Sequence, residues 1–217
     1  MPITKGLDKL VKYNDRSIKD LTTTPAAAGG GGTGAIVHIK TLTASSSATL
    51  SFVHGTDGVV LDSTYPIYRF EFINMHPATN NVGFSVNFRD GGTSYDATKT
   101  TTAFRAYHAE NNEAAVLEYE TGRDLAQSTS AQKLTTSTGN DNDKSVSGTL
   151  DLFNPSSGTF VKNFIAQVST LSSDNYNYNN FTAGYCNVVA SIDGVQFTMS
   201  SGNIDSGKIK LFGIGDS

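Results

Sequence analysis

The chain has 217 residues, a formal net charge of −4 and 37% hydrophobic residues, among them 12 Phe and 9 Tyr but no Trp. This length suffices for one large all-β domain with an appendage, and aromatic residues supply buried area that suits strands. The acidic balance and the lack of a Lys/Arg cluster argue against nucleic-acid binding, and no run reaches the ~18 apolar residues of a membrane span, so membrane insertion is not expected.

The first 34 residues predict an arm and a linker. Residues 1–21 carry apolar side chains at partly helical spacings, which predicts a short helical or extended arm. An isolated helix of this length is marginal in water, so its apolar side chains need a surface to pack on, and we expect the arm to dock. Residues 22–34 are rich in Gly, Ala and Thr and predict a linker. The arm can dock on a partner, fold back on its own domain or be a disordered tail. The positions expected to dock are Leu7, Leu10, Val11, Ile18 and Leu21.

Residues 35–217 predict a single antiparallel domain. Runs rich in Val, Ile, Thr, Phe and Tyr alternate with Gly, Asn, Asp and Ser, and no βαβ alternation is present. Apolar side chains at every second position in 70–74 and 84–88, and at Ile209 and Leu211, indicate half-buried strands. The expected fold is an all-β, antiparallel two-sheet sandwich of the jelly-roll type. The expected strands are 35–42, 48–54, 67–74, 82–89, 148–153, 160–169, 182–191, 195–200 and 208–214.

A long excursion at 90–146 interrupts this pattern. Residues 104–108 and 114–119 predict either a short helix or a hairpin, and residues 128–145 predict a surface loop. Within that loop, alternating oxygen-bearing side chains at 141–143 lack the other positions of a calcium-binding EF-hand loop, so a solvated loop is the preferred interpretation.

The sequence contains no recognisable catalytic motif. His38, His54, His76 and His108 have no metal-ligand spacing, and neither a nucleophile elbow nor a phosphate-binding loop is present. A hydrolytic carboxylate pair such as Glu118 and Glu120 cannot be assigned from spacing along the chain. We therefore expect no enzyme activity, no metal and no cofactor.

The single cysteine, Cys186, excludes an intramolecular disulfide and lies in an apolar setting typical of a buried strand position. The first residues contain Lys5, Asp8 and Lys9 where a signal peptide needs an apolar stretch. Folding in the cytoplasm of the producing cell is therefore expected.

A Tyr- and Asn-rich segment at 173–180 is the candidate for surface recognition. Exposed Tyr rings offer flat apolar faces, and Asn side chains offer adaptable hydrogen bonds, which suits sugars or protein surfaces. The candidate recognition residues are Tyr176 and Tyr178, with a polar hairpin loop that binds nothing as the alternative.

Three segments, 70–81, 148–157 and 200–214, carry a resemblance to virion structural proteins of tailed bacteriophages, particularly phages of aquatic bacteria and cyanobacteria. The resemblance covers residues 35–214. It implies a multi-copy structural subunit of tails, fibres, baseplates or capsid surfaces, and it assigns no functional residue. It also implies a homo-oligomer, with a trimer preferred by analogy with phage fibres.

The leading hypothesis is a non-enzymatic tail-fibre or baseplate-associated subunit that is anchored by its arm and assembled into the virion. Its partners are expected to be other virion proteins. A capsid decoration protein is the first alternative. A carbohydrate-binding module that recognises a host-surface glycan is the second, because jelly rolls commonly serve as lectin scaffolds.

Overall fold

The computed structural model describes residues 36–216. The predicted arm, with Leu7, Leu10, Val11, Ile18 and Leu21, and the linker at 22–34 lie outside the described residues. The described part folds into twelve strands and no helix, which confirms the all-β prediction. The strands are β1 (Ile36–Ser47), β2 (Leu50–Val53), β3 (Ile67–Pro77), β4 (Phe84–Arg89), β5 (Lys99–Ala109), β6 (Ala115–Tyr119), β7 (Gln132–Lys133), β8 (Val146–Phe153), β9 (Lys162–Leu171), β10 (Tyr176–Cys186), β11 (Gly194–Met199) and β12 (Ile204–Ile214).

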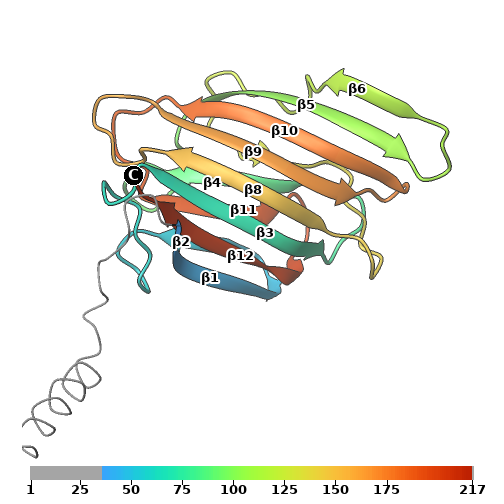
Figure 1. Cartoon of the computed structure of the whole chain (residues 1–217), viewed down its shortest axis with the longest axis horizontal. Helices are drawn as coiled ribbons and strands as arrows, with labels where there is room; N and C mark the ends of the chain where they lie inside the picture. Colours follow the sequence, from blue (N-terminus) through green and yellow to red (C-terminus); the bar gives the residue numbers. More distant parts are fainter. Residues whose placement is uncertain (1–35, 217) are drawn as a thin grey trace, which may run out of the picture.

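The strands form two antiparallel sheets that pack face to face (Figure 1). The larger sheet has the order β1-β12-β3-β8-β9-β10-β5-β6, and the smaller has the order β2-β11-β4-β7. When the hairpins β5–β6 and β9–β10 are set aside, the sheets read β1-β12-β3-β8 and β2-β11-β4-β7. This interleaving of early and late strands is the arrangement of a jelly roll, so the predicted sandwich is confirmed.

The core between the sheets is built from alternating aromatic side chains. Phe70 and Phe72 of β3 and Phe84 of β4 are buried, as the sequence pattern predicts. Phe197 of β11 lies at the centre, with its ring centroid 5.1 Å from that of Phe72 and 5.4 Å from that of Phe70. On β12, Ile209 and Leu211 have no exposed surface, which confirms the prediction that they share the buried face.

The two hairpins enlarge only the larger sheet, beyond β8, and form its upper part in Figure 1. We call β9, β10, β5 and β6 the extension. Part of its inner face is covered by the segment 120–145, which includes the short strand β7 of the smaller sheet. Leu134, Thr135 and Thr138 of this segment have no exposed surface, and Thr170 of β9 donates a hydrogen bond to Thr138 at 3.3 Å.

Two sequence predictions need correction here, and one open choice is settled. The middle of the predicted surface loop at 128–145 is buried, because its side chains fill the space beneath the extension. The excursion at 104–119 forms the hairpin β5–β6, which settles the open choice between helix and hairpin. Strand β10 begins at Tyr176, six residues before the predicted strand at 182.

Among the described residues, no helix has the length and apolar character needed to cross a membrane.

Candidate functional site

The hairpin β5–β6 distributes its side chains in an unusual way. Phe104, Leu117 and Tyr119 point away from the core and are 42%, 72% and 53% exposed, respectively. The charged residues Arg105 and Glu118 of the same strands point to the inner side, where they pair with each other. Because soluble proteins normally place charged side chains outside and aromatic ones inside, the reversed pattern marks the outer side as a candidate contact surface.

The absence of charged side chains on the outer side extends over all four strands of the extension. Alternate residues of the four strands face outward, and the strand registers place them in continuous rows across the sheet. Among these described outward-facing residues, none is Asp, Glu, Lys or Arg. We call this surface the neutral face. Its residues are Asn163, Ile165, Gln167, Ser169 and Leu171 of β9, Asn177, Asn179, Phe181, Ala183 and Tyr185 of β10, Thr100, Thr102, Phe104, Ala106 and His108 of β5, and Ala115, Leu117 and Tyr119 of β6.

The outer surface of the other half of the sheet differs in charge. There β12 presents Lys208 and Lys210, and β3 presents Arg69, which pairs with Asp151 of β8 through two hydrogen bonds of 2.7 and 2.8 Å. The outer side of the larger sheet therefore has a charged half and a neutral half. The boundary lies between β8 and β9.

A stacked pair of phenylalanine rings lies at the centre of the neutral face. Phe104 and Phe181 are directly opposite each other on β5 and β10, with ring centroids 4.7 Å apart and planes inclined by 9°. Tyr119 continues this row on β6, and Gln167 continues it on β9. The row forms an apolar strip of adjoining rings with one amide at its end.

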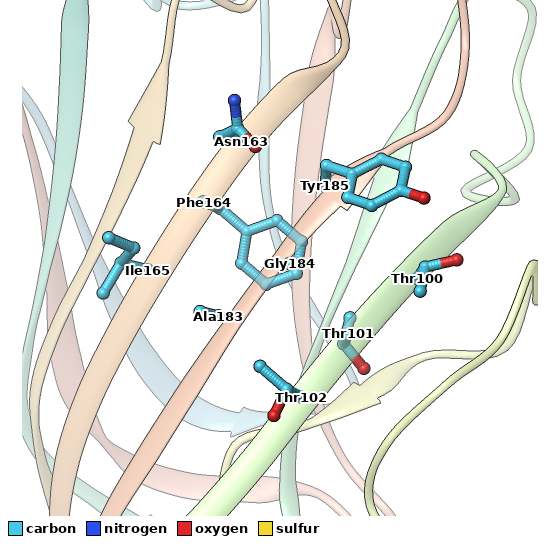
Figure 2. Close-up of a pocket in the computed structure, with 9 residues that line it drawn as sticks. All are labelled: Thr100, Thr101, Thr102, Asn163, Phe164, Ile165, Ala183, Gly184 and Tyr185. Atoms are coloured by element: carbon cyan, nitrogen blue, oxygen red, sulfur yellow. The ribbon is translucent and has the colours of Figure 1, made fainter.

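Beside this strip the surface has a shallow apolar depression of about 400 Å³ (Figure 2). Its floor is low because Ala183, which lies between Ile165 of β9 and Thr102 of β5, is small and the next residue, Gly184, has no side chain. Tyr185 stands at one end of the depression. The depression could accept one protruding side chain of a partner.

On the other side of the strip is a polar groove of about 410 Å³ between β8, β9 and β10. Gln167 Nε2 donates a hydrogen bond to Asn179 Oδ1 at 3.2 Å, and Ser169 Oγ donates one to Asn177 Oδ1, also at 3.2 Å. These bonds orient the amides and leave further donors and acceptors on an open surface. The groove can therefore form several hydrogen bonds with a neutral polar ligand.

The inner side of the extension holds the charges that the neutral face lacks. Arg105 Nη2 lies 2.7 Å from Glu118 Oε1, and Arg105 Nε lies 2.8 Å from Glu120 Oε1. The guanidinium also lies 4.5 Å from the ring centroid of Tyr178 and 5.2 Å from that of Tyr107. Both carboxylates thus bind one cation, and an ion-pair role accounts for them better than a hydrolytic pair.

The buried Arg123 fastens segment 120–145 to the sheet. Arg123 donates from Nη1 to Asn180 Oδ1 of β10, and burial lowers the pKa of Arg123 to about 10. Gln132 Nε2 donates to the backbone oxygen of Arg123 at 2.9 Å, while its Oε1 accepts from Thr101 at 2.6 Å. These contacts hold the segment against β5 and β10 and so support the extension from within.

The predicted recognition pair occupies a different place. Tyr176 and Tyr178 lie on strand β10 and not on a loop, and they stack with centroids 6.1 Å apart on the side opposite the neutral face. Tyr178 is only 9% exposed, and burial raises its pKa. The expectation of two exposed rings is wrong for Tyr178, because the ring packs against Arg105. The recognition role of the pair stays a prediction.

The other candidate groups are also accounted for. Among residues 36–216, no three His, Cys, Asp or Glu side chains are placed to hold a metal ion. His54 accepts a hydrogen bond from the backbone nitrogen of Leu61, and the His108 ring bonds to Asn112. Cys186 is buried, as predicted.

Sequence reasoning missed the neutral face. One usable signal was the pairing of Arg105 with Glu118, which a hairpin connecting 99–109 to 115–119 brings opposite each other. With those two residues assigned to one side, Phe104, Leu117 and Tyr119 fall together on the other.

Comparison with known proteins leaves the family open. No protein-family model matches the chain, and no curated protein matches it. Among solved structures, a structural-genomics protein of unknown function from Bacteroides ovatus is similar, with 6% sequence identity and a TM-score of 0.26. The match covers 54% of this chain and 45% of that one. A likeness this weak carries no argument about function.

Proposed function

We propose that the protein is a non-enzymatic structural subunit of a tailed-phage virion and that it contacts neighbouring subunits through the neutral face. The observation that carries this proposal is the reversed hairpin, with Phe104, Leu117 and Tyr119 outside and Arg105 and Glu118 inside. The resemblance of residues 35–214 to virion proteins supplies the kind of assembly. The jelly-roll order is compatible with it, since viral capsid domains use this scaffold among others.

The neutral face has the composition of an interface. The buried centres of protein interfaces are depleted of charged residues and enriched in aromatic ones, and large apolar patches are rare on monomeric proteins. The stacked rings of Phe104 and Phe181 form a rigid centre, and the adjoining depression can accept a side chain. An anchoring role for residues 1–21 completes the proposal, with the arm attached to the particle and the sandwich projecting from it.

Immunogold electron microscopy of intact particles tests the proposal, with an antibody raised against residues 36–214. Label on tails or baseplates is the expected result. Label over heads favours the alternative of a capsid decoration protein, in which the same face contacts capsid neighbours. Disrupted particles serve as the control that shows whether the chain is present. If the chain is present but intact particles carry no label, its epitope is buried. If purified particles do not contain the chain, the virion proposal is contradicted.

The arm has its own test. A chain lacking residues 1–34 is expected to retain the fold of the sandwich, because the described strands form a complete core without them. Its incorporation into particles is expected to be lost. Normal incorporation of the shortened chain means that the sandwich itself provides the attachment.

The polar groove supports carbohydrate binding as a second candidate function. Its oriented amides and the neighbouring Phe181 combine hydrogen-bonding groups with a flat apolar ring, which is the pairing that sugars require. A glycan array with the full chain tests it, with Asn179→Ala as the site variant and Asn111→Ala, on the exposed turn after β5, as the control. Binding that only Asn179→Ala abolishes supports this function, and no binding by the parent chain rejects it.

A further inference from the structure

Strand β6 presents an open edge of the larger sheet. Among the described residues, β5 pairs with one side of β6 and no strand pairs with its other side. Ala109 donates its backbone N–H to Ala114 O at 2.9 Å, and Glu120 donates to Ala103 O at 2.9 Å. The backbone N–H and C=O groups of successive residues in an antiparallel strand point alternately to its two sides, so those of the even-numbered residues of β6 point toward β5. The backbone groups of Ala115, Leu117 and Tyr119 therefore point outward from the edge.

This edge lacks the features by which proteins usually block strand addition. It contains no Pro and no Lys, and its one charged side chain, Glu118, is held on the inner side by Arg105. The opposite edge, β1, has a register irregularity between His38 and Lys40, which is a common protection. Strands β2 and β7, at the edges of the smaller sheet, are only four and two residues long.

We propose that β6 pairs antiparallel with β6 of a second copy of this chain, about a two-fold axis at Leu117, so that two eight-stranded sheets join into one. In this register Leu117 lies opposite Leu117 of the second copy, and Ala115 lies opposite its Tyr119. These are the residues with free backbone groups on both strands. Each opposed pair exchanges two backbone hydrogen bonds, as an antiparallel ladder requires.

The side chains also match in this register. Ala115, Leu117 and Tyr119 lie on the outer side of both strands, so the apolar rows of the two neutral faces become continuous. On the inner side, Glu118 lies opposite Val116 of the second copy. The two Glu118 carboxylates are thus not opposed, and each keeps its ion pair with Arg105 of its own chain.

A second copy fits these constraints better than an unrelated strand. A foreign strand needs a matching row of apolar side chains and free backbone groups at the residues opposite Ala115, Leu117 and Tyr119. It also needs to have no acid opposite Glu118. Strand β6 of a second copy satisfies all three conditions. The two-fold contact differs from the three-fold assembly that the virion resemblance implies. It is independent of the proposed virion role, since it concerns the isolated protein in solution.

Charge substitution at the two-fold axis gives the sharpest test. Leu117→Glu and Leu117→Lys each place like charges opposite each other, so each variant alone is expected to be monomeric in sedimentation velocity, while the unaltered chain is a dimer. An equimolar mixture of the two variants is expected to form the dimer again. Val189→Glu, at a loop residue that is 74% exposed, is the control and is expected to remain dimeric.

Cross-linking provides an independent measurement. Opposed residues of a hydrogen-bonded antiparallel pair have Cα atoms about 5.5 Å apart, which a disulfide can span. Leu117→Cys is expected to form a covalent dimer on mild oxidation, and Val189→Cys is not. The native Cys186 is buried and does not compete.

A monomeric or trimeric unaltered chain overturns the proposal, and so does a mixture of Leu117→Glu and Leu117→Lys that stays monomeric. Circular dichroism and urea unfolding of each variant verify that the fold is intact. Because the Leu117 side chain is 72% exposed, its substitution is not expected to unfold the domain. Should Leu117→Glu nevertheless fail to fold, the disulfide result alone decides, since Leu117→Cys keeps a small apolar side chain.

Discussion

Lys99 of β5 lies directly opposite Cys186 of β10, and neither side chain has exposed surface. Lys162 of β9 flanks the same cysteine on its other side. The lysine ammonium groups are satisfied by backbone oxygens, since Lys99 donates to Ser130 at 2.8 Å and Lys162 donates to Val188 at 2.8 Å. The row places two buried amines and one thiol on the inner side of the extension.

The thiol of Cys186 is expected to be unreactive in the folded protein. Burial raises the pKa of Cys186 to about 12, although both neighbouring lysines lower it. Thiol reagents act on the thiolate, so labelling with iodoacetamide at pH 8 is expected only after unfolding in urea. Mass spectrometry measures the extent of labelling. Rapid labelling of the folded chain contradicts the buried position of Cys186.

The buried Lys99 predicts a rise in stability above pH 8. Burial lowers the pKa of Lys99 from 10.5 to about 8. Below about pH 8 the amine is protonated in both states, and the folded state bears the full cost of a buried cation. Above that pH the folded state releases the proton while the unfolded state retains it, so the free energy of unfolding increases.

The window for this effect is narrow because Cys186 acts in the opposite direction. Above about pH 9 the unfolded thiol loses its proton while the folded thiol keeps it, which lowers stability. Urea midpoints measured at intervals between pH 7 and pH 9 are therefore expected to rise. The rise is expected to be smaller in Lys99→Met, and an equal rise in both chains contradicts the assignment to Lys99.

Gly207 is expected to tolerate no side chain. Its φ is +121°, and a Cβ placed there lies 2.5 Å from the backbone oxygen of Asn74 and 2.8 Å from Cα of Met75. Backbone atoms cannot move aside cheaply, so Gly207→Ala is expected to lower the free energy of unfolding by about 2–4 kcal/mol. Gly58→Ala is the matched control, because φ is +79° there but nothing lies within 4 Å. Urea unfolding is expected to show a loss of only about 1 kcal/mol for this control.

Two phenylalanines separate core packing from surface contact. Phe197 is fully buried among Phe52, Phe70 and Phe72, so Phe197→Ala is expected to cost about 3–5 kcal/mol of unfolding free energy. Phe104 is 42% exposed, and Phe104→Ala is expected to cost about 1 kcal/mol. Comparable losses in denaturant titrations of the two variants contradict the assignment of Phe104 to a contact surface.

The strands of the sandwich were predictable where one face is buried and the other is wet. Phe70 and Phe72, Phe84 and Phe88, and Ile209 all follow this alternation, because each strand has one side against the core. The same rule led to the expected two-sheet architecture. Strand order is not contained in such a pattern, since it depends on contacts between distant segments.

The extension was harder to predict because both of its sides carry mixed residues. In β5 the inner side holds Arg105 and Tyr107, and the outer side holds Phe104 and His108, so no apolar period of two stands out. The start of β10 was missed because Asn is rare in strands. Asn177 and Asn179 are tolerated there because their side chains lie on the open outer face.

The pairing of Ile36 with Ile214 places both ends of residues 36–214 on the same side of the larger sheet. Both residues lie on β1 and β12 at one edge of the larger sheet, and β6 forms the opposite edge (Figure 1). With strands about 4.8 Å apart, the two edges are separated by roughly 35 Å. A bead, a fluorophore or a neighbouring subunit joined at either end of residues 36–214 is therefore attached on the β1–β12 side of the larger sheet. The β6 edge, at which we propose the two-fold contact, stays free on the far side.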